Sequence, residues 1–146
     1  MTLPSHPHSI IIVIPCFNEE KRLPTKAFLD FSKTHPEIFF LFVNDGSTDD
    51  TTHVLSRLHE QLPQTTDVLH LPRNSGKAEA VRQGFLKSFR LSPTFIAFWD
   101  ADLATPLDEI IVFHDMLTKH TQTEMVFGVR GAKPGATERG FWRHSL

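Results

Sequence analysis

Five short apolar runs, each followed by a polar turn and then by helical periodicity, constrain the fold of this chain more than any other feature. The runs are continuously apolar, as expected for strands that helices cover on both faces of a parallel sheet. Alternating strands and helices predict an α/β fold: a doubly wound, mainly parallel sheet with helices on both faces. The runs occupy residues 10–14, 38–43, 68–71, 95–99 and 125–129.

The segments between the runs repeat apolar residues at helical spacing, which predicts a buried face for each helix. These faces are Phe28, Leu29 and Phe31 in the first helix, Val54, Leu58 and Leu62 in the second, Ala78, Val81, Phe85 and Phe89 in the third, and Ile110, Ile111 and Leu117 in the fourth. Pro24 is expected to open the first helix, and Pro63 to end the second. Thr105 is the predicted N-cap of the fourth, with Pro106 at its first helical position.

Composition narrows the class of protein. A chain of 146 residues predicts one domain, over residues 10–146, after a disordered lead-in over residues 1–9. A formal net charge of −2 gives no indication of nucleic-acid binding. We find no signal peptide, and the apolar runs are too short to span a bilayer, so we expect a cytoplasmic chain that is soluble or peripheral on the cytoplasmic membrane face. The single cysteine, Cys16, excludes an internal disulfide and a cysteine zinc cluster.

Asp100 and Asp102 follow the fourth apolar run and are separated by one small residue. In extended backbone, residues two apart point to the same side, so both carboxylates would face one spot. Two hard oxygen ligands suit Mg²⁺ or Mn²⁺, which keep waters and share their coordination with substrate phosphates. The alternative is an acidic turn that caps the next helix.

Polar sequence also follows the other apolar runs. In doubly wound sheets, ligands bind outside the carboxyl ends of the strands, where the strand order reverses. The strings at those ends are PCFNEE, NDGSTD and RNSGK after the first three runs, and GVR at the fifth. Any one of them could be ordinary turn chemistry, but together, on one predicted rim, they indicate a binding site.

The strings IPCFNEE, VNDGSTDDT, RNSGKAEAVRQGF, DADLATP and GVR resemble glycosyltransferase family 2 of the GT-A fold, in the family's order and approximate spacing. The text around EEKRLP and DADLATPLDEI is most similar to the polyprenyl-phosphate branch, particularly the dolichyl-phosphate β-glucosyltransferases. The resemblance implies a nucleotide-sugar-binding domain of an inverting enzyme. Such an enzyme moves a hexose from UDP-glucose or GDP-mannose to an acceptor, here a polyprenyl or dolichyl phosphate at a membrane surface.

The resemblance also implies roles for individual residues. Asp102 would be the direct metal ligand, Asp100 would bind metal and sugar nucleotide, and Arg130 would face the phosphates, which makes these three the implied catalytic set. The implied nucleotide-sugar contacts are Pro15, Phe17, Glu19, Asp45, Lys77 and Asp100, and the implied acceptor or diphosphate contacts are Arg139 and Arg143. Phe17 replaces the tyrosine common in relatives, and Asn44 replaces an aspartate found in many of them.

Purely structural interpretations stay open for several of these residues. Ser47 or Asp49 could simply cap the helix that follows. Lys77 follows a glycine at a predicted helix start, where backbone N–H groups favour anions, but it could also be a solvated helix lysine. The string around it does not satisfy the Walker A pattern. Arg139 and Arg143 could belong to a solvated basic tail.

No candidate general base follows the paired aspartates. This favours a phosphate-monoester acceptor, whose second pKa of about 6 leaves it largely dianionic at neutral pH. Relatives continue past the last arginine, so the resemblance implies that the acceptor side is missing, and we expect the exposed apolar surface to cause self-association. Two further hypotheses are a nucleotide-binding module without transfer activity and a nucleotidyltransferase-like enzyme, for which IPCFNEE is not the expected glycine- and arginine-rich loop.

Overall fold

The computed structural model describes residues 9–128. Their elements are β1 (Ile10–Cys16), α1 (Thr25–Thr34), β2 (Ile38–Asp45), α2 (Thr51–Gln61), β3 (Thr66–Leu71), α3 (Lys77–Phe89), β4 (Phe95–Phe98) and α4 (Asp108–Lys119). The chain divides into two compact units, Met1–Leu107 and Asp108–Leu146. The whole sheet and its first three helices therefore belong to the first unit, and α4 belongs to the second. The predicted lead-in over residues 1–9 lies, except for Ser9, outside the described residues.

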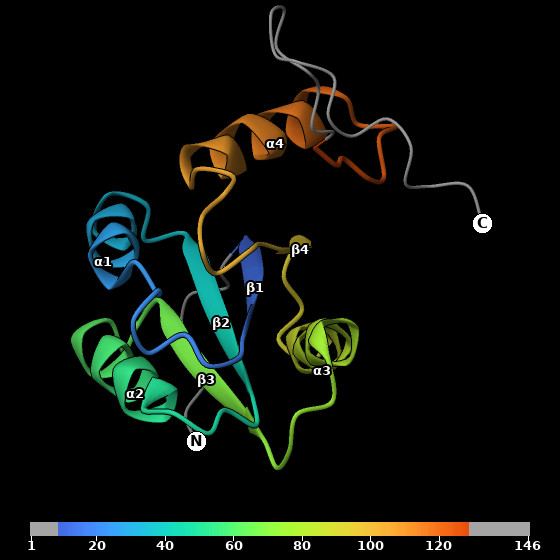
Figure 1. Ribbon diagram of the computed structural model, residues 1–146. Coiled ribbons are helices and arrows are strands. Elements are labelled where there is room, and N and C mark those ends of the chain that lie inside the picture. Colours follow the sequence, from blue (N-terminus) through green and yellow to red (C-terminus); the bar gives the residue numbers. More distant parts are fainter. Residues whose placement is uncertain (1–8, 129–146) are drawn as a thin grey trace, which may run out of the picture. The chain divides into compact units, whose positions relative to one another are not determined.

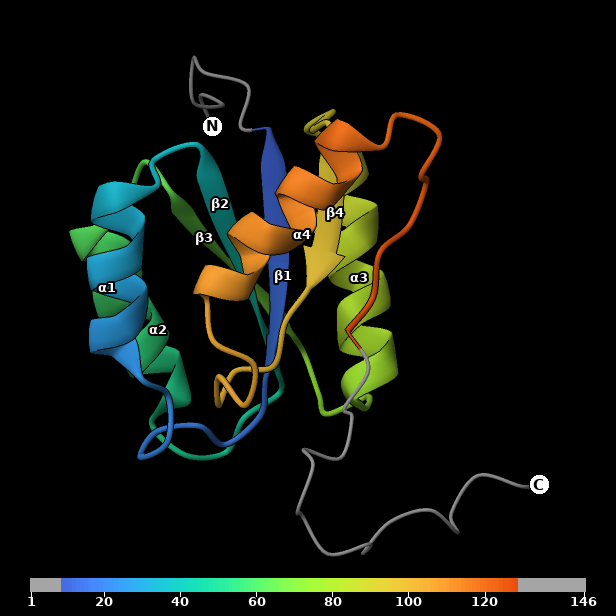
Figure 2. The same cartoon turned by 90° about the horizontal axis from the view of Figure 1, so that it is seen from above.

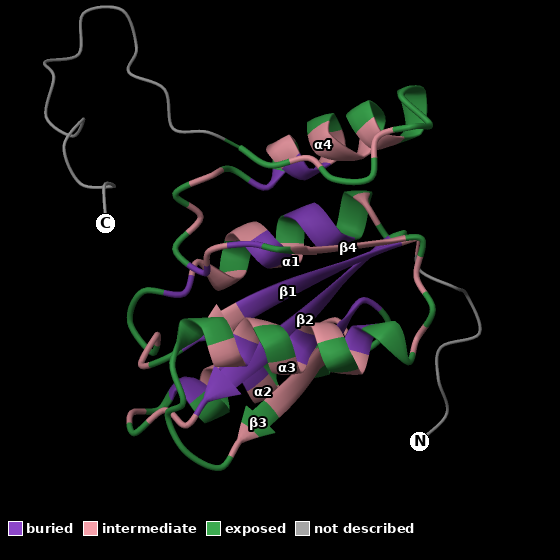
Figure 3. Cartoon of the chain, turned by 90° about the vertical axis from the view of Figure 1, so that its right-hand side faces the viewer, coloured by how far each residue is buried: buried purple, intermediate pink, exposed green. Residues whose placement is uncertain are grey.

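The first unit is built on four parallel strands in the order β3-β2-β1-β4 (Figure 1). Every residue of β2 is buried, and so is every residue of β1 except Pro15; both strands appear in purple in Figure 3. The register pairs Cys16 with Asn44 and Val13 with Phe98, so β1 and β2 run on past the end of β4. The predicted parallel α/β sheet is confirmed.

Helices cover both faces of this sheet (Figures 1 and 2). On one face, the ring of Phe28 in α1 packs edge-on against Phe40 and Phe42 of β2, with ring centroids 5.3 and 5.2 Å apart. Side chains alternate between the two faces along a strand, and Leu41, between those phenylalanines, packs in a cluster with Ala80 of α3. Because α1 and α3 lie on opposite faces, the sheet is doubly wound as predicted.

The first two helices form where the sequence predicts them, but their buried faces match the prediction only in part, because Leu29, Val54 and Leu62 are half-buried. Pro24 is the N-cap residue of α1, which buries Phe28 and Phe31. In α2 the buried side chains include Leu58, as expected, but Leu55 takes the place predicted for Val54. Within residues 9–128, no helix has the length and apolar character needed to cross a membrane.

Small residues, rather than the predicted large ones, form the buried face of α3. The buried residues of this helix are Ala80, Gly84 and Ser88. Ala78 is exposed, and Phe89 is 63% exposed, so the prediction for these two residues was wrong. A Cβ added at Gly84 would lie only 2.4 Å from Cγ1 of Val13. The helix therefore approaches β1 too closely for a larger side chain, and the missing volume at Gly84 decides which face is buried.

Two predictions for the later part of the chain are also wrong. The helix α4 begins at Asp108 rather than at Pro106, and the Thr105 carbonyl accepts a hydrogen bond from the indole Nε1 of Trp99 at 2.8 Å. Residues 125–128 form no strand, and Met125 and Phe127 are 76% and 74% exposed. An apolar run becomes a strand only where another strand supplies hydrogen-bond partners, and no described strand pairs with this one.

Candidate functional site

A pocket of about 360 Å³ lies at the carboxyl ends of β1, β2 and β4, within the first unit. The strand order reverses here, because β1 leads through α1 to β2 on one side and pairs with β4 on the other. This is where doubly wound sheets bind their ligands. The lining residues are Pro15, Cys16, Phe17, Glu19, Arg22, Asp45, Asn74, Gly76, Lys77, Ala80, Asp100, Ala101 and Asp102.

Most of the residues predicted from sequence meet in this one pocket. They come from the carboxyl ends of β1 and β2, the start of α3 and the segments that follow β1 and β4, which the parallel sheet brings to a single edge. The predicted residues that line the pocket are Pro15, Phe17, Glu19, Asp45, Lys77, Asp100 and Asp102. The other three predicted site residues, Arg130, Arg139 and Arg143, lie outside the described residues.

Asp100 and Asp102 both line the pocket, but not through the extended backbone that we predicted. The N–H of Leu103 donates to the carbonyl of Asp100 at 3.1 Å, which closes a turn, and Leu103 has a φ of +54°. Ala101 is buried at 6% exposure. Asp102 is exposed, and its Oδ1 accepts a hydrogen bond from the N–H of Ala104 at 3.0 Å. A tight turn, rather than strand alternation, therefore presents the two carboxylates.

Lys77 is the first residue of α3, and its ammonium forms an ion pair with Oδ1 of Asp100. The same nitrogen lies 5.8 Å from the ring centroid of Phe98, within the range of a cation–π contact. The side chain of Lys77 is 60% exposed, so solvent screens this ion pair and holds its contribution to stability low. The lysine is thus a largely exposed positive charge at the N-terminus of a helix.

Asp45 holds the loop that precedes α3. Its carboxylate is almost fully buried, at 2% exposure. Oδ1 accepts a hydrogen bond from the N–H of Ser75 at 2.8 Å, and Oδ2 accepts one from the N–H of Gly76 at 2.9 Å. Gly46 has a φ of +62°, and a Cβ there would lie 2.3 Å from the backbone nitrogen of Asn74. The two loops thus meet backbone to backbone, and Asp45 shapes the pocket as well as lining it.

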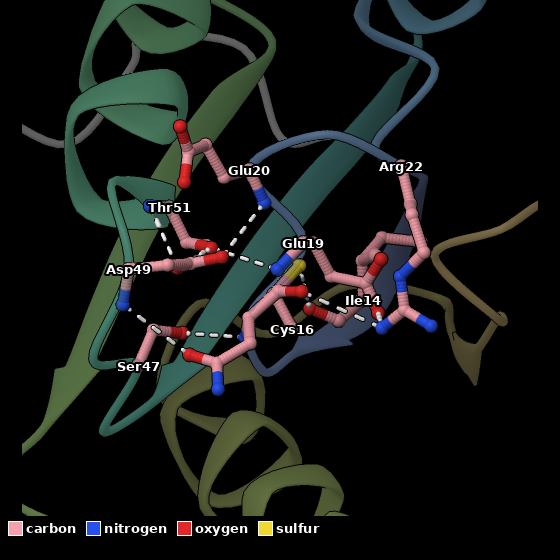
Figure 4. Close-up of polar contacts among 9 residues, drawn as sticks. Ile14, Cys16, Glu19, Glu20, Arg22, Ser47, Asp49 and Thr51 are labelled. Carbon is pink, nitrogen blue, oxygen red and sulfur yellow. Dashed lines mark hydrogen bonds and ion pairs between the residues drawn. The ribbon is translucent and has the colours of Figure 1, made fainter.

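Side chains before and within the first turn of α2 hold the loop that follows β1 (Figure 4). The N–H of Asn18 donates to Oγ of Ser47 at 3.0 Å, and the N–H of Glu19 donates to Oγ1 of Thr51 at 2.7 Å. Two successive backbone donors are therefore bound by side chains about thirty residues away. This arrangement fixes the stretch that carries Phe17 and Glu19 into the pocket wall.

Asp49 serves both the loop and the helix start. It accepts hydrogen bonds from the N–H of Thr51 at 3.0 Å and from the N–H of Glu20 at 3.2 Å. The N-cap residue of α2 is Asp50, which makes no side-chain capping bond. Of the two caps considered from sequence, Asp49 thus binds a helix N–H, whereas the hydroxyl of Ser47 accepts from the other loop.

Glu19 places a carboxylate in the pocket wall. Its Oε1 accepts a hydrogen bond from Nη2 of Arg22 at 3.0 Å, and its Oε2 is buried without a hydrogen-bond partner among the residues that the structure describes. Burial raises the pKa of Glu19; Arg22 opposes this, whereas the charges of Asp102 and Asp49 add to it. Arg22 was not predicted from the sequence. Its positive charge three residues after Glu19 was the signal that could have indicated this pair.

Cys16 lines the pocket as a neutral thiol. It is 1% exposed, and its Sγ donates to the carbonyl oxygen of Ile14 at 3.5 Å. Burial raises the pKa of this thiol, and the charge of Glu19 adds to the effect. Since the thiolate is the nucleophilic form, the raised pKa makes Cys16 poorly suited to act as a catalytic nucleophile.

The pocket lining is negatively charged. The carboxylates of Glu19, Asp45, Asp100 and Asp102 face only two cations, Arg22 and Lys77, which leaves a formal charge of −2. An anionic ligand would be repelled unless a cation came with it. No group of three or more His, Cys, Asp or Glu side chains within residues 9–128 could hold a metal ion by itself. The oxygens of Asp100 and Asp102 do fit a magnesium-type site, which takes one or two carboxylates and completes its coordination with ligand and water.

Comparison with known proteins identifies the family. The model of the family "Glycosyl transferase family 2" matches residues 11–145. The chain belongs to glycosyl transferase family 2. Its curated relatives in family 2 include the dolichyl-phosphate beta-glucosyltransferase ALG5A of Trichomonas vaginalis, to which it is 32% identical over 130 residues, covering 82% of this chain and 39% of that protein.

A second relative of this family 2 chain is the undecaprenyl-phosphate 4-deoxy-4-formamido-L-arabinose transferase of an Enterobacter species. The two are 33% identical over 108 residues, which covers 70% of this chain and 32% of that protein. The chain thus spans between 32% and 39% of the length of these two relatives.

Solved structures show the fold of this family 2 chain. The structure resembles S. aureus TarS 1–349 in complex with UDP-GlcNAc, with a TM-score of 0.61 and 22% identity, covering 77% of this chain and 32% of that one. It also resembles the mannosyltransferase PcManGT from Pyrobaculum calidifontis in complex with GDP-Man and Mn²⁺, with a TM-score of 0.60 and 20% identity, covering 78% and 33%. The predicted GT-A fold is confirmed.

Proposed function

We propose that the pocket binds the nucleotide-sugar donor of an inverting hexosyltransferase. The observation that carries this proposal is that seven predicted residues, far apart in the sequence, line one pocket where the strand order reverses. The neighbours support it, because TarS was solved with UDP-GlcNAc and PcManGT with GDP-Man. UDP-glucose and GDP-mannose are the donors that we propose for this chain.

The lining supplies chemistry for each part of such a donor. Phe17 is 40% exposed and offers an apolar ring face on which a nucleobase can stack, with Pro15 beside it. Asp45 keeps Ser75 and Gly76 in place before α3. Lys77 begins that helix, where the helix dipole and an ammonium together favour the diphosphate. We assign the base to the β1 end of the pocket and the phosphates to the α3 end.

Asp102, with Asp100 beside it in the lining, would hold Mg²⁺ or Mn²⁺ in this pocket. A cation is needed here because the lining carries a net negative charge, which repels a diphosphate unless a counter-charge accompanies it. A bound divalent ion supplies Lewis-acid stabilisation to the departing diphosphate. The two aspartates would hold this ion, and the buried Ala101 lies in the turn between them.

A polyprenyl phosphate at the cytoplasmic face of a membrane is the proposed acceptor. Two relatives are named for dolichyl-phosphate and undecaprenyl-phosphate. A phosphate monoester is already an anion at neutral pH, with a second pKa of about 6, so it can attack the anomeric carbon without a general base. Arg130, Arg139 and Arg143 are the proposed contacts to acceptor or diphosphate on sequence grounds.

A nucleotide-binding module without transfer activity is the second candidate. Such a module needs only the pocket of the first unit, whose lining residues all lie between Pro15 and Asp102. Family membership removes the nucleotidyltransferase-like hypothesis.

A turnover assay separates the two candidates. UDP-glucose or GDP-mannose is incubated with dolichyl phosphate and Mn²⁺, and formation of the lipid-linked hexose is followed. We expect metal-dependent product that Asp102→Asn abolishes. Asp115→Asn in α4, which removes a carboxylate paired with Lys119 on an exposed helix, should keep wild-type activity. Nucleotide binding without turnover would favour the module, and absence of nucleotide binding would contradict both.

A further inference from the structure

We propose that Lys77 occupies the cation position beside Asp100 in the ligand-free protein, so that a divalent ion binds tightly only together with the nucleotide diphosphate. The inference rests on the proposed function and adds to it an order of binding. Its starting observation is the ion pair between the Lys77 ammonium and Oδ1 of Asp100.

Two elements of the first unit direct the lysine toward this carboxylate. The N–H of Gly76 donates to the carboxylate of Asp45, which fixes the backbone immediately before Lys77 at the start of α3. The ammonium then bridges to the end of β4, where it meets Asp100 and lies 5.8 Å from the ring centroid of Phe98. The anchored backbone and the aromatic ring together favour the position beside Asp100 over free solvent.

A lysine in this position competes with a divalent ion. The ammonium neutralises one of the carboxylates that the ion needs, and its own positive charge repels the incoming dication. The ion must therefore displace it. Displacing the ammonium of Lys77 requires little free energy. The side chains of Lys77 and Asp100 are 60% and 32% exposed, and ion pairs this exposed contribute little to stability. The lysine therefore weakens metal binding without blocking it.

The diphosphate gives the displaced lysine a new partner. Lys77 stands at the N-terminus of the thirteen-residue helix α3, where anions are favoured. A lysine is a compact point charge on a flexible four-carbon stem, so it can turn from Asp100 to a phosphate without movement of the backbone. Asp100 is then released for the ion. Nucleotide and metal must consequently raise each other's affinity by the same factor.

Mn²⁺ titrations of the full chain test this, with free Mn²⁺ measured by electron paramagnetic resonance. The variants are Lys77→Gln, Lys77→Arg, which keeps the charge, and Lys87→Gln as a matched control. Lys87 lies on the same helix and forms an ion pair with Asp67 at 2.6 Å. Without nucleotide, we expect Lys77→Gln to bind Mn²⁺ about three- to tenfold more tightly than the wild type. Lys77→Arg and Lys87→Gln should match the wild type.

Adding UDP or GDP should reverse the order, so that the wild type binds Mn²⁺ more tightly than Lys77→Gln does. The inference would be overturned if, without nucleotide, Lys77→Gln bound Mn²⁺ no more tightly than the wild type. It would also be overturned if Lys77→Arg bound Mn²⁺ as tightly as Lys77→Gln does. After either of these two outcomes, the proposed function would still stand as long as the wild type bound Mn²⁺ in a nucleotide-dependent way. A wild type that binds no Mn²⁺ with any nucleotide would overturn both.

Discussion

The backbone N–H of Glu19 donates a hydrogen bond to the hydroxyl of Thr51, 2.7 Å away and 32 residues later in the chain. Thr51 is fully buried and does not line the pocket. It nevertheless ties the loop after β1 to the first turn of α2 (Figure 4). The wall that carries Phe17 and Glu19 is thus positioned by a side chain outside the pocket.

Replacing Thr51 with valine should test this bond, because valine is similar in size and lacks the hydroxyl. We expect a loss of about 1–2 kcal/mol in the free energy of unfolding, since the N–H of Glu19 is left without its acceptor. Nucleotide binding should weaken as well. Urea denaturation and UDP titration measure the two effects.

Thr118→Val is the matched control, because the hydroxyl of Thr118 donates only to carbonyls of its own helix. It should leave nucleotide affinity unchanged. A Thr51→Val protein that binds nucleotide as well as the wild type would show that this bond does not position the pocket wall.

Asp45→Asn should loosen the loop before α3. Asparagine keeps one acceptor oxygen but sets an NH₂ group against a backbone donor, so one of the bonds to Ser75 and Gly76 is lost. For so buried a group we expect a loss of about 1–3 kcal/mol. Amide hydrogen exchange at Ser75 and Gly76 should accelerate. Asp30→Asn, on the exposed side of α1, should leave that exchange unchanged. Unaltered protection in Asp45→Asn would contradict the assigned role.

Gly84→Ala should destabilise the protein although alanine is the better helix former. The added Cβ would lie 2.4 Å from Val13 and 3.0 Å from Val43. Overpacking of this kind costs about 1–3 kcal/mol, which outweighs the roughly 1 kcal/mol of helix propensity. The urea midpoint shows whether the substitution lowers or raises the stability of the protein. Leu86→Ala, at a 44% exposed position of the same helix, should have the smaller effect. A more stable Gly84→Ala protein would refute the close approach of α3 and β1.

Glu19 and Glu79 should give opposite pH dependences of stability. Burial raises the pKa of Glu19 above its ordinary value of 4.5, so its contribution is fully present below that value and is lost as the pH rises through the folded pKa. Hydrogen bonds from Arg82 and Gln83 lower the pKa of Glu79 to about 2. Its contribution is therefore present above its ordinary pKa and is lost as the pH falls toward 2.

Urea midpoints from about pH 2 to about pH 8 measure both effects. Glu19→Gln should gain stability relative to the wild type as the pH rises through the raised pKa. Glu79→Gln should be less stable than the wild type near neutral pH and approach it in acid. Parallel curves for Glu19→Gln and the wild type would show that burial of this carboxylate does not disfavour its charge.

The central strands could be predicted from sequence because both of their faces are covered, which leaves an uninterrupted apolar run such as the buried β2. The buried face of α3 could not, because a pattern of large residues carries no information on how closely Gly84 lets the helix approach. Residues 125–128 have the same apolar character as the true strands. Composition alone cannot report whether a partner strand is present.

The pocket could be predicted because parallel strands place their carboxyl ends on one edge, so Phe17, Asp45 and Asp102 had to converge once the topology was known. The contribution of Thr51 could not be predicted. A bond between a backbone N–H and a side chain 32 residues away leaves no spacing signal in the sequence. The turn that begins at Asp100 was not predicted, because a polar residue after an apolar run can either continue the extended strand or begin a turn.

Calorimetric titration of UDP and GDP, with and without Mn²⁺, tests the central claim most directly. We predict that at least one nucleotide binds, that binding requires the metal, and that Asp102→Asn weakens it by at least about tenfold, or about 1.4 kcal/mol. Asp115→Asn should bind as the wild type does. Absence of binding by either nucleotide at any metal concentration, or wild-type affinity in Asp102→Asn, would contradict the account.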